Sequence, residues 1–145
     1  MTNFEVDVRL IKLSGLISAS WQQAAAQWDL SPTAVHLLLA LRKEDDVPMG
    51  RFPQVCPATK SNVTAVVDSL EERGLVMRHP DSADRRVIRI RLTEEGRHLA
   101  ARLPSHAELF ADSPTAHLSP EERDQLCRLL EKIESPLEVM PVRSN

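Results

Sequence analysis

Hydrophobic residues recur at helical spacing near both ends of the chain. From about Val6 to Trp28 they stand three and four positions apart, which predicts a long amphipathic helix with a narrow apolar stripe. Near the other end, Ser119-Pro120-Glu121-Glu122 combines a capping box with a first-turn proline. The helix predicted there carries its own stripe, made of Leu126, Leu129, Leu130 and Ile133. Neither stripe has an obvious partner inside a compact central unit, so together they predict a homodimer.

Three further helices are predicted between the two ends. Each begins at a hydroxyl side chain suited to an N-cap: Ser31, Thr59 and Thr93. They extend over about 32–43, 59–73 and 93–110. Gly74 suits the left-handed residue that ends the second helix, and Pro104 predicts a kink or break in the third. The first is apolar enough to be buried on more than one side.

The remaining segments predict a short irregular helix and a hairpin. Four residues, Pro48, Gly50, Pro53 and Pro57, leave room only for a short helix over about 49–56. Residues 75–78 and 87–92 are typical of strands, and the second strand alternates apolar residues with arginine. Residues 79–86, rich in Asp, Ser and Pro, form the predicted turn. The expected fold is therefore mainly α with a small two-stranded β-ribbon that lies against the helices.

Composition narrows the class of protein. The 145 residues suit a single domain, and the hydrophobic and charged fractions, 42% and 27%, are those of a soluble globular protein. No apolar run reaches the roughly 20 residues that span a bilayer, and the start does not resemble a signal peptide. We therefore expect a cytoplasmic protein without a membrane partner. No catalytic motif, phosphate-binding glycine loop or metal-ligand spacing is present, so we expect neither an enzyme nor a cofactor or metal.

Charge is distributed unevenly along this acidic chain. Residues 73–91 hold six arginines against two aspartates, a local charge of +4, although the whole chain carries −3. The rest of the chain therefore carries −7. A basic hairpin next to a helix can dock on DNA, the helix in one groove and the hairpin in the next, while the acidic body discourages nonspecific adhesion. A solvated hairpin with charged edges is the alternative that charge alone leaves open.

Three motifs in this region resemble those of the MarR family of bacterial transcriptional regulators. They are Asp68-Ser69-Leu70-Glu71-Glu72-Arg73-Gly74-Leu75-Val76, Asp81-Ser82-Ala83-Asp84-Arg85-Arg86 and Leu92-Thr93-Glu94-Glu95-Gly96. The close match covers about a quarter of the chain, and helix order extends a weaker likeness to nearly all of it. The resemblance implies one domain over 1–145, with a winged helix-turn-helix core over 31–100. Residues 1–29 and 117–145 would then be dimerisation helices.

The resemblance also implies a homodimer that binds a palindromic operator in double-stranded DNA, most simply as a repressor released by a signal. The helix over 59–73 would be the recognition helix, and its early outward residues would approach base edges and phosphates: Lys60, Ser61, Asn62, Thr64 and Ala65. The ribbon would be the wing. Arg85 and Arg86 at its tip would enter the minor groove, and Asp84 would brace an arginine.

Other arginines are secondary DNA candidates. Arg78, Arg89 and Arg91 would touch phosphate or keep the ribbon soluble, and Arg51 is a weaker phosphate candidate. The family usually has a regular helix and a glycine where this chain has Pro53 and Pro57. We therefore expect the supporting helix to be shortened or bent.

Three alternatives stay open at this point. The chain could be a winged-helix protein-interaction module without DNA binding, or a redox-responsive regulator that uses Cys56 and Cys127. A small-molecule effector is also possible, because members of the family often sense phenolic ligands. Five residues could line its pocket, although each is more often core or interface: Trp21, Trp28, His36, Met49 and Phe52.

Overall fold

The chain forms two compact units, Met1–Ala111 and Asp112–Asn145. The structure is a computed structural model that describes residues 2–55 and 60–134. The predicted cap Thr59, the turn residue Pro57 and Cys56 lie outside the described residues. The predicted division into one domain with dimerisation helices at 1–29 and 117–145 remains a prediction.

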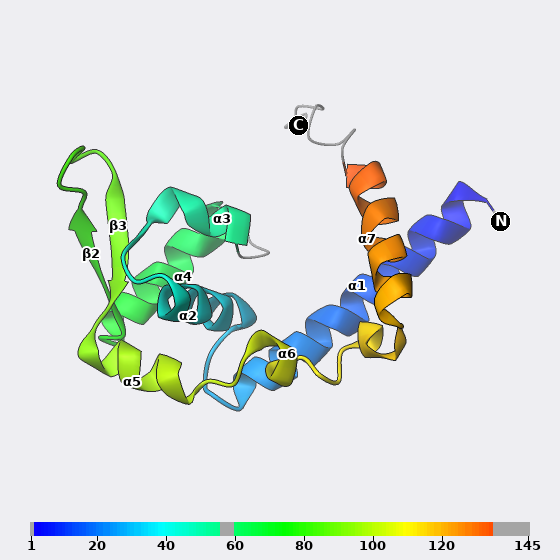
Figure 1. Ribbon diagram of the computed structural model, residues 1–145, viewed down its shortest axis with the longest axis horizontal. Helices are drawn as coiled ribbons and strands as arrows, with labels where there is room; N and C mark the ends of the chain where they lie inside the picture. Colours follow the sequence, from blue (N-terminus) through cyan, green and yellow to red (C-terminus); the bar gives the residue numbers. More distant parts are fainter. Residues whose placement is uncertain (1, 56–59, 135–145) are drawn as a thin grey trace. The chain divides into compact units, whose positions relative to one another are not determined.

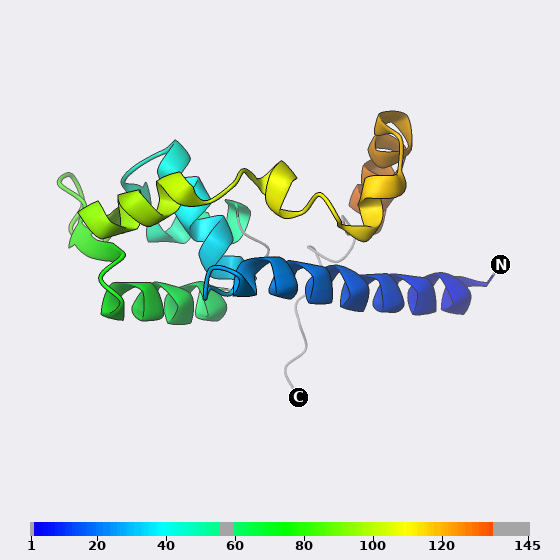
Figure 2. The ribbon, with the colours of Figure 1, turned by 90° about the horizontal axis from the view of Figure 1, so that it is seen from below.

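The first unit begins with two helices that the sequence predicted. Helix α1 covers Asn3–Ala26 and runs unbroken (Figure 2). It starts earlier than expected because Thr2 forms a capping box with Glu5. Helix α2 covers Pro32–Lys43, begins at the predicted N-cap Ser31, and has seven buried residues, as its apolar density indicated.

The supporting helix before the turn is short, as Pro53 led us to expect. The 3-10 turn η1 (Met49–Arg51) leads directly into α3 (Phe52–Val55), where Pro53 is the second residue and its missing N–H costs no hydrogen bond. Helix α4 then covers Lys60–Glu72. Gly74 follows it with a φ of +69°, the left-handed conformation expected of a residue that ends a helix.

The predicted break at Pro104 is present. Helix α5 covers Glu94–Arg102, and a separate short helix, α6, covers His106–Leu109 behind its own capping residue Ser105. Arg42 of α2 donates hydrogen bonds to the carbonyl oxygens of Ala100 and Leu103, at 2.9 and 2.6 Å. The Arg42 guanidinium thereby caps the C-terminal end of α5.

The sheet has three strands, and the predicted two-stranded ribbon was therefore incomplete. Strands β2 (Val76–Pro80) and β3 (Ile88–Leu92) form the expected antiparallel hairpin beside α4 (Figure 1). The missed strand, β1 (Val47–Pro48), pairs with the other edge of β3, Val47 opposite Ile90. Two residues that include a proline give no alternation to recognise. The strand β2 also extends to Pro80, so the turn is shorter than predicted.

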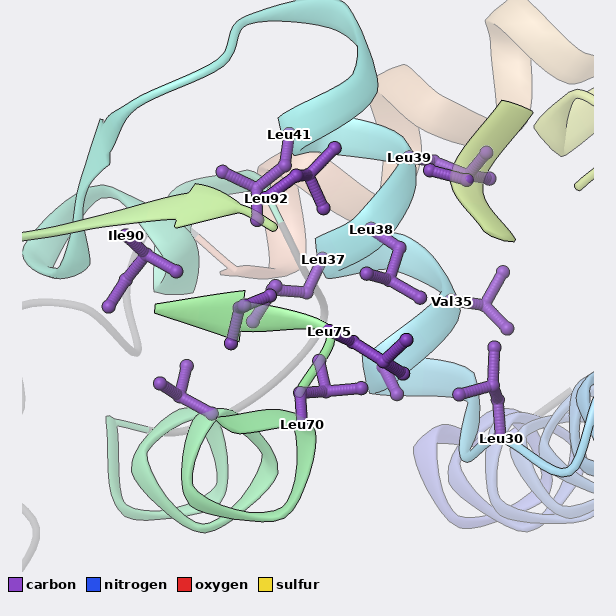
Figure 3. Packing of buried hydrophobic residues seen from close by; sticks show 14 of the residues in the cluster. Leu30, Val35, Leu37, Leu38, Leu39, Leu41, Leu70, Leu75, Ile90 and Leu92 are labelled. Carbon is purple, nitrogen blue, oxygen red and sulfur yellow. The ribbon is translucent and has the colours of Figure 1, made fainter. Parts of the chain in front are cut away.

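A single apolar cluster joins the sheet to the helices of this unit. Figure 3 shows Leu37 and Leu38 of α2 in one cluster with Ile90 of β3 and Leu70 of α4. Phe52 of α3 is completely buried in the same cluster. Burial of these side chains fixes the hairpin and α4 against one body, since a lone hairpin is marginally stable.

The base of the hairpin is joined tightly to α5. The Thr93 hydroxyl donates to the Gly74 carbonyl oxygen at 2.6 Å and accepts from the Gly96 amide at 3.0 Å. A Cβ on Gly96 would lie 1.8 Å from the Leu75 carbonyl oxygen, so only glycine allows this approach. The motif Leu92-Thr93-Glu94-Glu95-Gly96 is therefore the joint between the sheet and α5.

The second unit contains the 3-10 turn η2 (Pro114–His117) and α7 (Pro120–Glu134). The predicted capping box is present, because Ser119 and Glu122 bond each other's backbone N–H groups at 2.8 and 3.2 Å. On α7, Leu129 and Ile133 are exposed, as Phe4, Ile11 and Leu16 are on α1. Within the described residues, no helix is both long enough and apolar enough to cross a bilayer.

Candidate nucleic-acid interface

Helix α4 separates an apolar inner face from a polar outer face. Val63, Val67 and Leu70 are buried. All five residues predicted to face DNA are exposed: Lys60, Ser61, Asn62, Thr64 and Ala65. The Thr64 hydroxyl donates to the Lys60 carbonyl oxygen at 3.0 Å. Short side chains on this face let the helix backbone approach the floor of a major groove.

The tip of the wing, residues 82–87, is exposed and carries two arginines. The Arg86 side chain is 95% exposed, and its Nε lies 3.6 Å from the Asp84 carboxylate. Asp84 also accepts a hydrogen bond from the Arg86 amide at 3.0 Å. Arg85 is exposed as well. Asp84 therefore orders the turn around Arg86 while the guanidinium stays open to solvent.

The base of the wing, residues 78–81 and 89, is ordered by acidic partners. The Arg78 guanidinium donates to Asp68 and Glu71 of α4, each at 2.5 Å. Glu71 also accepts the Arg78 amide at 3.1 Å. The hydrogen bonds and charges of these two carboxylates outweigh partial burial and raise the pKa of Arg78. Arg78 thus ties β2 to α4.

A second arginine at the base connects three segments. Arg89 Nε lies 3.1 Å from an Asp46 carboxylate oxygen, and its Nη1 donates to Asp81 at 2.9 Å. His79, the cross-strand neighbour of Arg89, places Nε2 2.6 Å from the same Asp46 oxygen. Burial tends to raise the pKa of Asp46, but the hydrogen bonds from His79 and Arg89 and their charges outweigh it, so the pKa lies below its ordinary value.

Asp81 controls the entrance to the turn. One carboxylate oxygen accepts the amides of Ala83 and Asp84, at 2.8 and 3.2 Å, and the other accepts from Arg89. The two backbone hydrogen bonds, then the bond from Arg89, lower the pKa of Asp81. This carboxylate therefore stays ionised and keeps both contacts well below neutral pH.

The acidic run Glu44-Asp45-Asp46 was not recognised from the sequence. Glu44 pairs with Arg51 at 3.0 Å, Asp45 accepts from the Leu92 amide and pairs with Arg97, and Asp46 holds the wing base. Adjacent acids usually indicate a solvated loop, and their partners lie far away in the chain. Arg51, a predicted phosphate candidate, thus has an acidic neighbour. Arg91, another predicted candidate, donates a hydrogen bond to the Met77 sulfur at 3.0 Å.

A cavity of about 870 Å³ is lined by α2, by the loop that follows α2 and by the start of α6. Its basic lining residues are Arg42, Lys43 and Arg51, and its lining also includes Glu44. Ser105 and two histidines, His36 and His106, complete the polar part of the wall. A cavity of this volume is large enough for a small organic ligand, and the three cations favour an anionic one.

The two histidines of the cavity wall are in direct contact. His36 Nδ1 lies 2.8 Å from His106 Nε2, and the rings stack at 4.8 Å. Trp21 and Phe110 pack against His36 at 5.1 and 5.4 Å. Burial, followed by the charge of His106, lowers the pKa of His36 to about 4, and burial and Arg42 lower that of His106. Both rings are therefore neutral at pH 7.

The other residues considered as pocket lining lie elsewhere. Phe52 is buried in the core, and Trp28 and Met49 pack against that core. Trp21 reaches the cavity only through His36. Cys127 is an exposed free thiol on α7. Among the described residues, no three His, Cys, Asp or Glu side chains are grouped to hold a metal ion.

These features together define a class of protein. A helix with an exposed polar face lies beside a hairpin whose exposed tip is cationic, on a body of packed helices. That arrangement is the winged helix-turn-helix of DNA-binding proteins.

Comparison with known proteins gives the family. The sequence profile of the MarR family matches residues 28–87. The transcriptional regulator PecS of Dickeya dadantii is 33% identical over 135 residues, which cover 88% of this chain and 79% of PecS. YkoM of Bacillus subtilis, an uncharacterised regulator, is 40% identical over 72 residues, 49% of this chain and 46% of YkoM. The chain belongs to the MarR family of transcriptional regulators.

A solved structure is also similar. BpsR of Bordetella bronchiseptica is 27% identical and superposes with a TM-score of 0.72. The superposition covers 90% of this chain and 98% of BpsR. The likeness therefore extends beyond the winged helix-turn-helix to most of both chains.

Proposed function

We propose that this protein is a sequence-specific DNA-binding repressor that acts as a homodimer in the cytoplasm and responds to a small molecule. The observation that carries the proposal is the exposed pair Arg85 and Arg86, held at the end of a braced hairpin beside the exposed face of α4. A planar guanidinium is well suited to a narrow, negative minor groove.

In the proposed complex, the outer face of α4 enters the major groove and the wing tip enters the adjoining minor groove. The residues proposed at the major groove are Lys60, Ser61, Asn62, Thr64 and Ala65. Asp84 keeps the tip in shape. Arg78 and Arg89 contribute by holding the hairpin at its angle, because their guanidinium groups already bond acidic residues.

Two copies of the chain are proposed to bind one palindromic operator. The apolar side chains exposed on α1 and those exposed on α7 support a dimer, since association would remove each set from water. Two recognition helices in successive major grooves require half-site centres about one helical turn apart, roughly 10 bp.

A small anion is proposed as the releasing signal. BpsR is described as a regulator whose DNA binding is controlled by 6-hydroxynicotinic acid, an aromatic carboxylic acid. In this chain, the cavity beside α2 offers Lys43 for such a charge, together with Arg42, which also bonds two carbonyl oxygens, and Arg51, which also pairs with Glu44. Arg51→Ala would then reduce the effect of a bound anion on DNA affinity without abolishing DNA binding.

The central experiment selects duplexes from a random pool with the purified protein and then measures affinity for the selected duplex by fluorescence anisotropy. Arg86→Ala should weaken binding at least about fivefold, most at A·T-rich minor-groove positions. Arg102→Ala, which removes an exposed arginine at the end of α5, outside the surfaces proposed for DNA and for the dimer, is the matched control and should bind as the parent does. Lys60→Ala should flatten the salt dependence by about one unit if Lys60 neutralises a phosphate.

Two results would contradict the proposal. The first is that the protein retains no duplex at low ionic strength. The second is that Arg86→Ala and Arg102→Ala bind the selected duplex equally well. Sedimentation of the free protein as a monomer at micromolar concentration would refute the dimer separately.

A further inference from the structure

Asp46 lies outside every surface proposed to touch DNA, yet it meets two strands of the wing. Its backbone has a φ of +70°, a left-handed conformation that aspartate tolerates better than most residues. It immediately precedes β1, whose pairing with β3 sets Pro48 opposite Arg89. The carboxylate thereby reaches Arg89 and its cross-strand neighbour His79 at once.

From Asp46, a chain of hydrogen bonds and ion pairs leads through the base of the wing. The Asp46 carboxylate meets Arg89 Nε at 3.1 Å, and the Asp46 carbonyl oxygen accepts from Arg89 Nη2. The same guanidinium donates its Nη1 hydrogen to Asp81. Because a guanidinium is planar, these three contacts fix its orientation and hence the position of Asp81.

The path continues from Asp81 into the tip. The Asp81 carboxylate accepts the amides of Ala83 and Asp84, and Asp84 in turn accepts the amides of Arg86 and Val87, on its side chain and its carbonyl oxygen. The Asp81 amide donates to the Val87 carbonyl oxygen and closes the turn. Asp81 takes part in three of these five hydrogen bonds, and the other two are accepted by Asp84, whose amide Asp81 holds.

We propose that Asp46 is a positioning residue for DNA recognition, which acts through Arg89 and Asp81 to hold Arg86 where it enters the minor groove. The inference rests on the proposed function. Without the Asp46 carboxylate, Arg89 loses one of its two acidic partners and His79 loses the acceptor at Nε2. The tip then samples more conformations, and ordering them on DNA costs affinity.

The test uses Asp46→Asn, which removes the charge and keeps a residue that tolerates positive φ. Asp29→Asn is the matched control, because Asp29 also has a positive φ, of 53°, but lies at the turn between α1 and α2. Affinity is measured on a duplex selected by the parent protein. Asp46→Asn should lose about tenfold in affinity, and Asp29→Asn should lose less than about twofold.

A double-mutant cycle separates positioning from a general structural role. In the Arg86→Ala background, Asp46→Asn should cost less than about twofold, because the side chain that Asp46 positions is gone. Amide hydrogen exchange at Ala83 and Val87 should be faster in Asp46→Asn than in Asp29→Asn. Arg89→Lys, which keeps the charge but not the planar fork, should reproduce the tenfold loss even if Asp46→Asn folds poorly.

The outcomes are distinguishable. Equal affinity of Asp46→Asn and Asp29→Asn overturns the inference and leaves the proposed function intact. A loss of the same size in both backgrounds also overturns it, since Asp46 would then act independently of Arg86. An Arg86→Ala variant with parental affinity removes the wing from DNA recognition, and the inference fails with it.

Discussion

At the base of the wing, the side chains of Arg78 and Arg89 are 26% and 24% exposed and each contacts two acidic residues. At the tip, the Arg86 side chain is 95% exposed and has a single acidic neighbour at 3.6 Å. The same residue type thus occurs in two electrostatic settings within one hairpin.

This difference means that the arginines of the base hold the hairpin rigid, whereas those of the tip keep their charge available for a binding partner. A guanidinium that is already bonded to carboxylates contributes little further attraction for phosphate, but it fixes the segments that it joins. An exposed guanidinium stabilises the fold little and retains its charge for a partner. The local charge of +4 in residues 73–91 therefore overstates what the base can offer and understates how sharply charge is concentrated at the tip.

The largest expected effect comes from breaking the joint beneath the base. In Gly96→Ala, the new Cβ would lie 1.8 Å from the Leu75 carbonyl oxygen, which forces backbone movement. We expect a loss of about 3 kcal/mol in the free energy of unfolding, measured by urea denaturation. Gly50→Ala is the control, because nothing lies within 4 Å of a Cβ there. Equal stability of both variants would mean that the backbone around Gly96 and Leu75 moves apart at no cost in free energy.

Acid should weaken the helical body before it weakens the wing base. The pKa of His36 is about 4 in the fold and about 6.5 when unfolded, so the unfolded chain binds more protons between these values. The contribution of neutral His36 to the free energy of unfolding is fully present above about pH 6.5 and is lost as the pH drops toward 4. The contribution of His36 to this loss between pH 7 and 5 is about 2 kcal/mol.

The variant His36→Leu tests this origin of acid sensitivity, because its unfolding free energy should fall by about 2 kcal/mol less over the same interval. His98→Leu, at an exposed position of α5, should fall as the parent does. Asp46 and Asp81 have lowered pKa values, so their contacts persist over this pH interval. Identical pH profiles of the parent and His36→Leu would contradict the assignment.

The smallest expected effects separate the two ends of the wing: an arginine of the base should affect stability, and an arginine of the tip should affect DNA affinity. Arg78→Ala should lower the free energy of unfolding by about 1 kcal/mol, since it leaves Asp68 and Glu71 without their shared cation. Arg85→Ala should leave stability within about 0.5 kcal/mol and weaken DNA binding instead. Urea denaturation and anisotropy on the same samples test both. If Arg85→Ala destabilised the fold as much as Arg78→Ala, base and tip would not differ in role.

Local patterns predicted most of the fold. The N-caps Ser31 and Thr93, the helix stop at Gly74 and the break at Pro104 depend on neighbouring residues only, and the structure has all four. Strand β1 was missed because Val47–Pro48 becomes a strand only through its pairing with β3. Its conformation is set by tertiary contact rather than by its own residues.

The sequence predicted which residues form the exposed part of the candidate site, but not which side chains pair with one another. Periodicity identified the exposed face of α4, and the motif around Arg85 and Arg86 identified the tip. The pairing of Arg89 with Asp46 spans 43 positions in the chain, and no local pattern indicates it. The contact between His36 and His106, 70 positions apart, was hidden for the same reason.

The position of Trp21 gives the protein a built-in optical probe. The chain has two tryptophans and no tyrosine, so its ultraviolet emission comes from Trp21 and Trp28 alone. The indole of Trp21 packs edge-on against the His36 ring and at 5.0 Å from the Phe110 ring. Emission from the unlabelled protein, compared with that of a Trp28→Phe variant, therefore reports changes at His36 in the cavity wall and can follow ligand entry in real time.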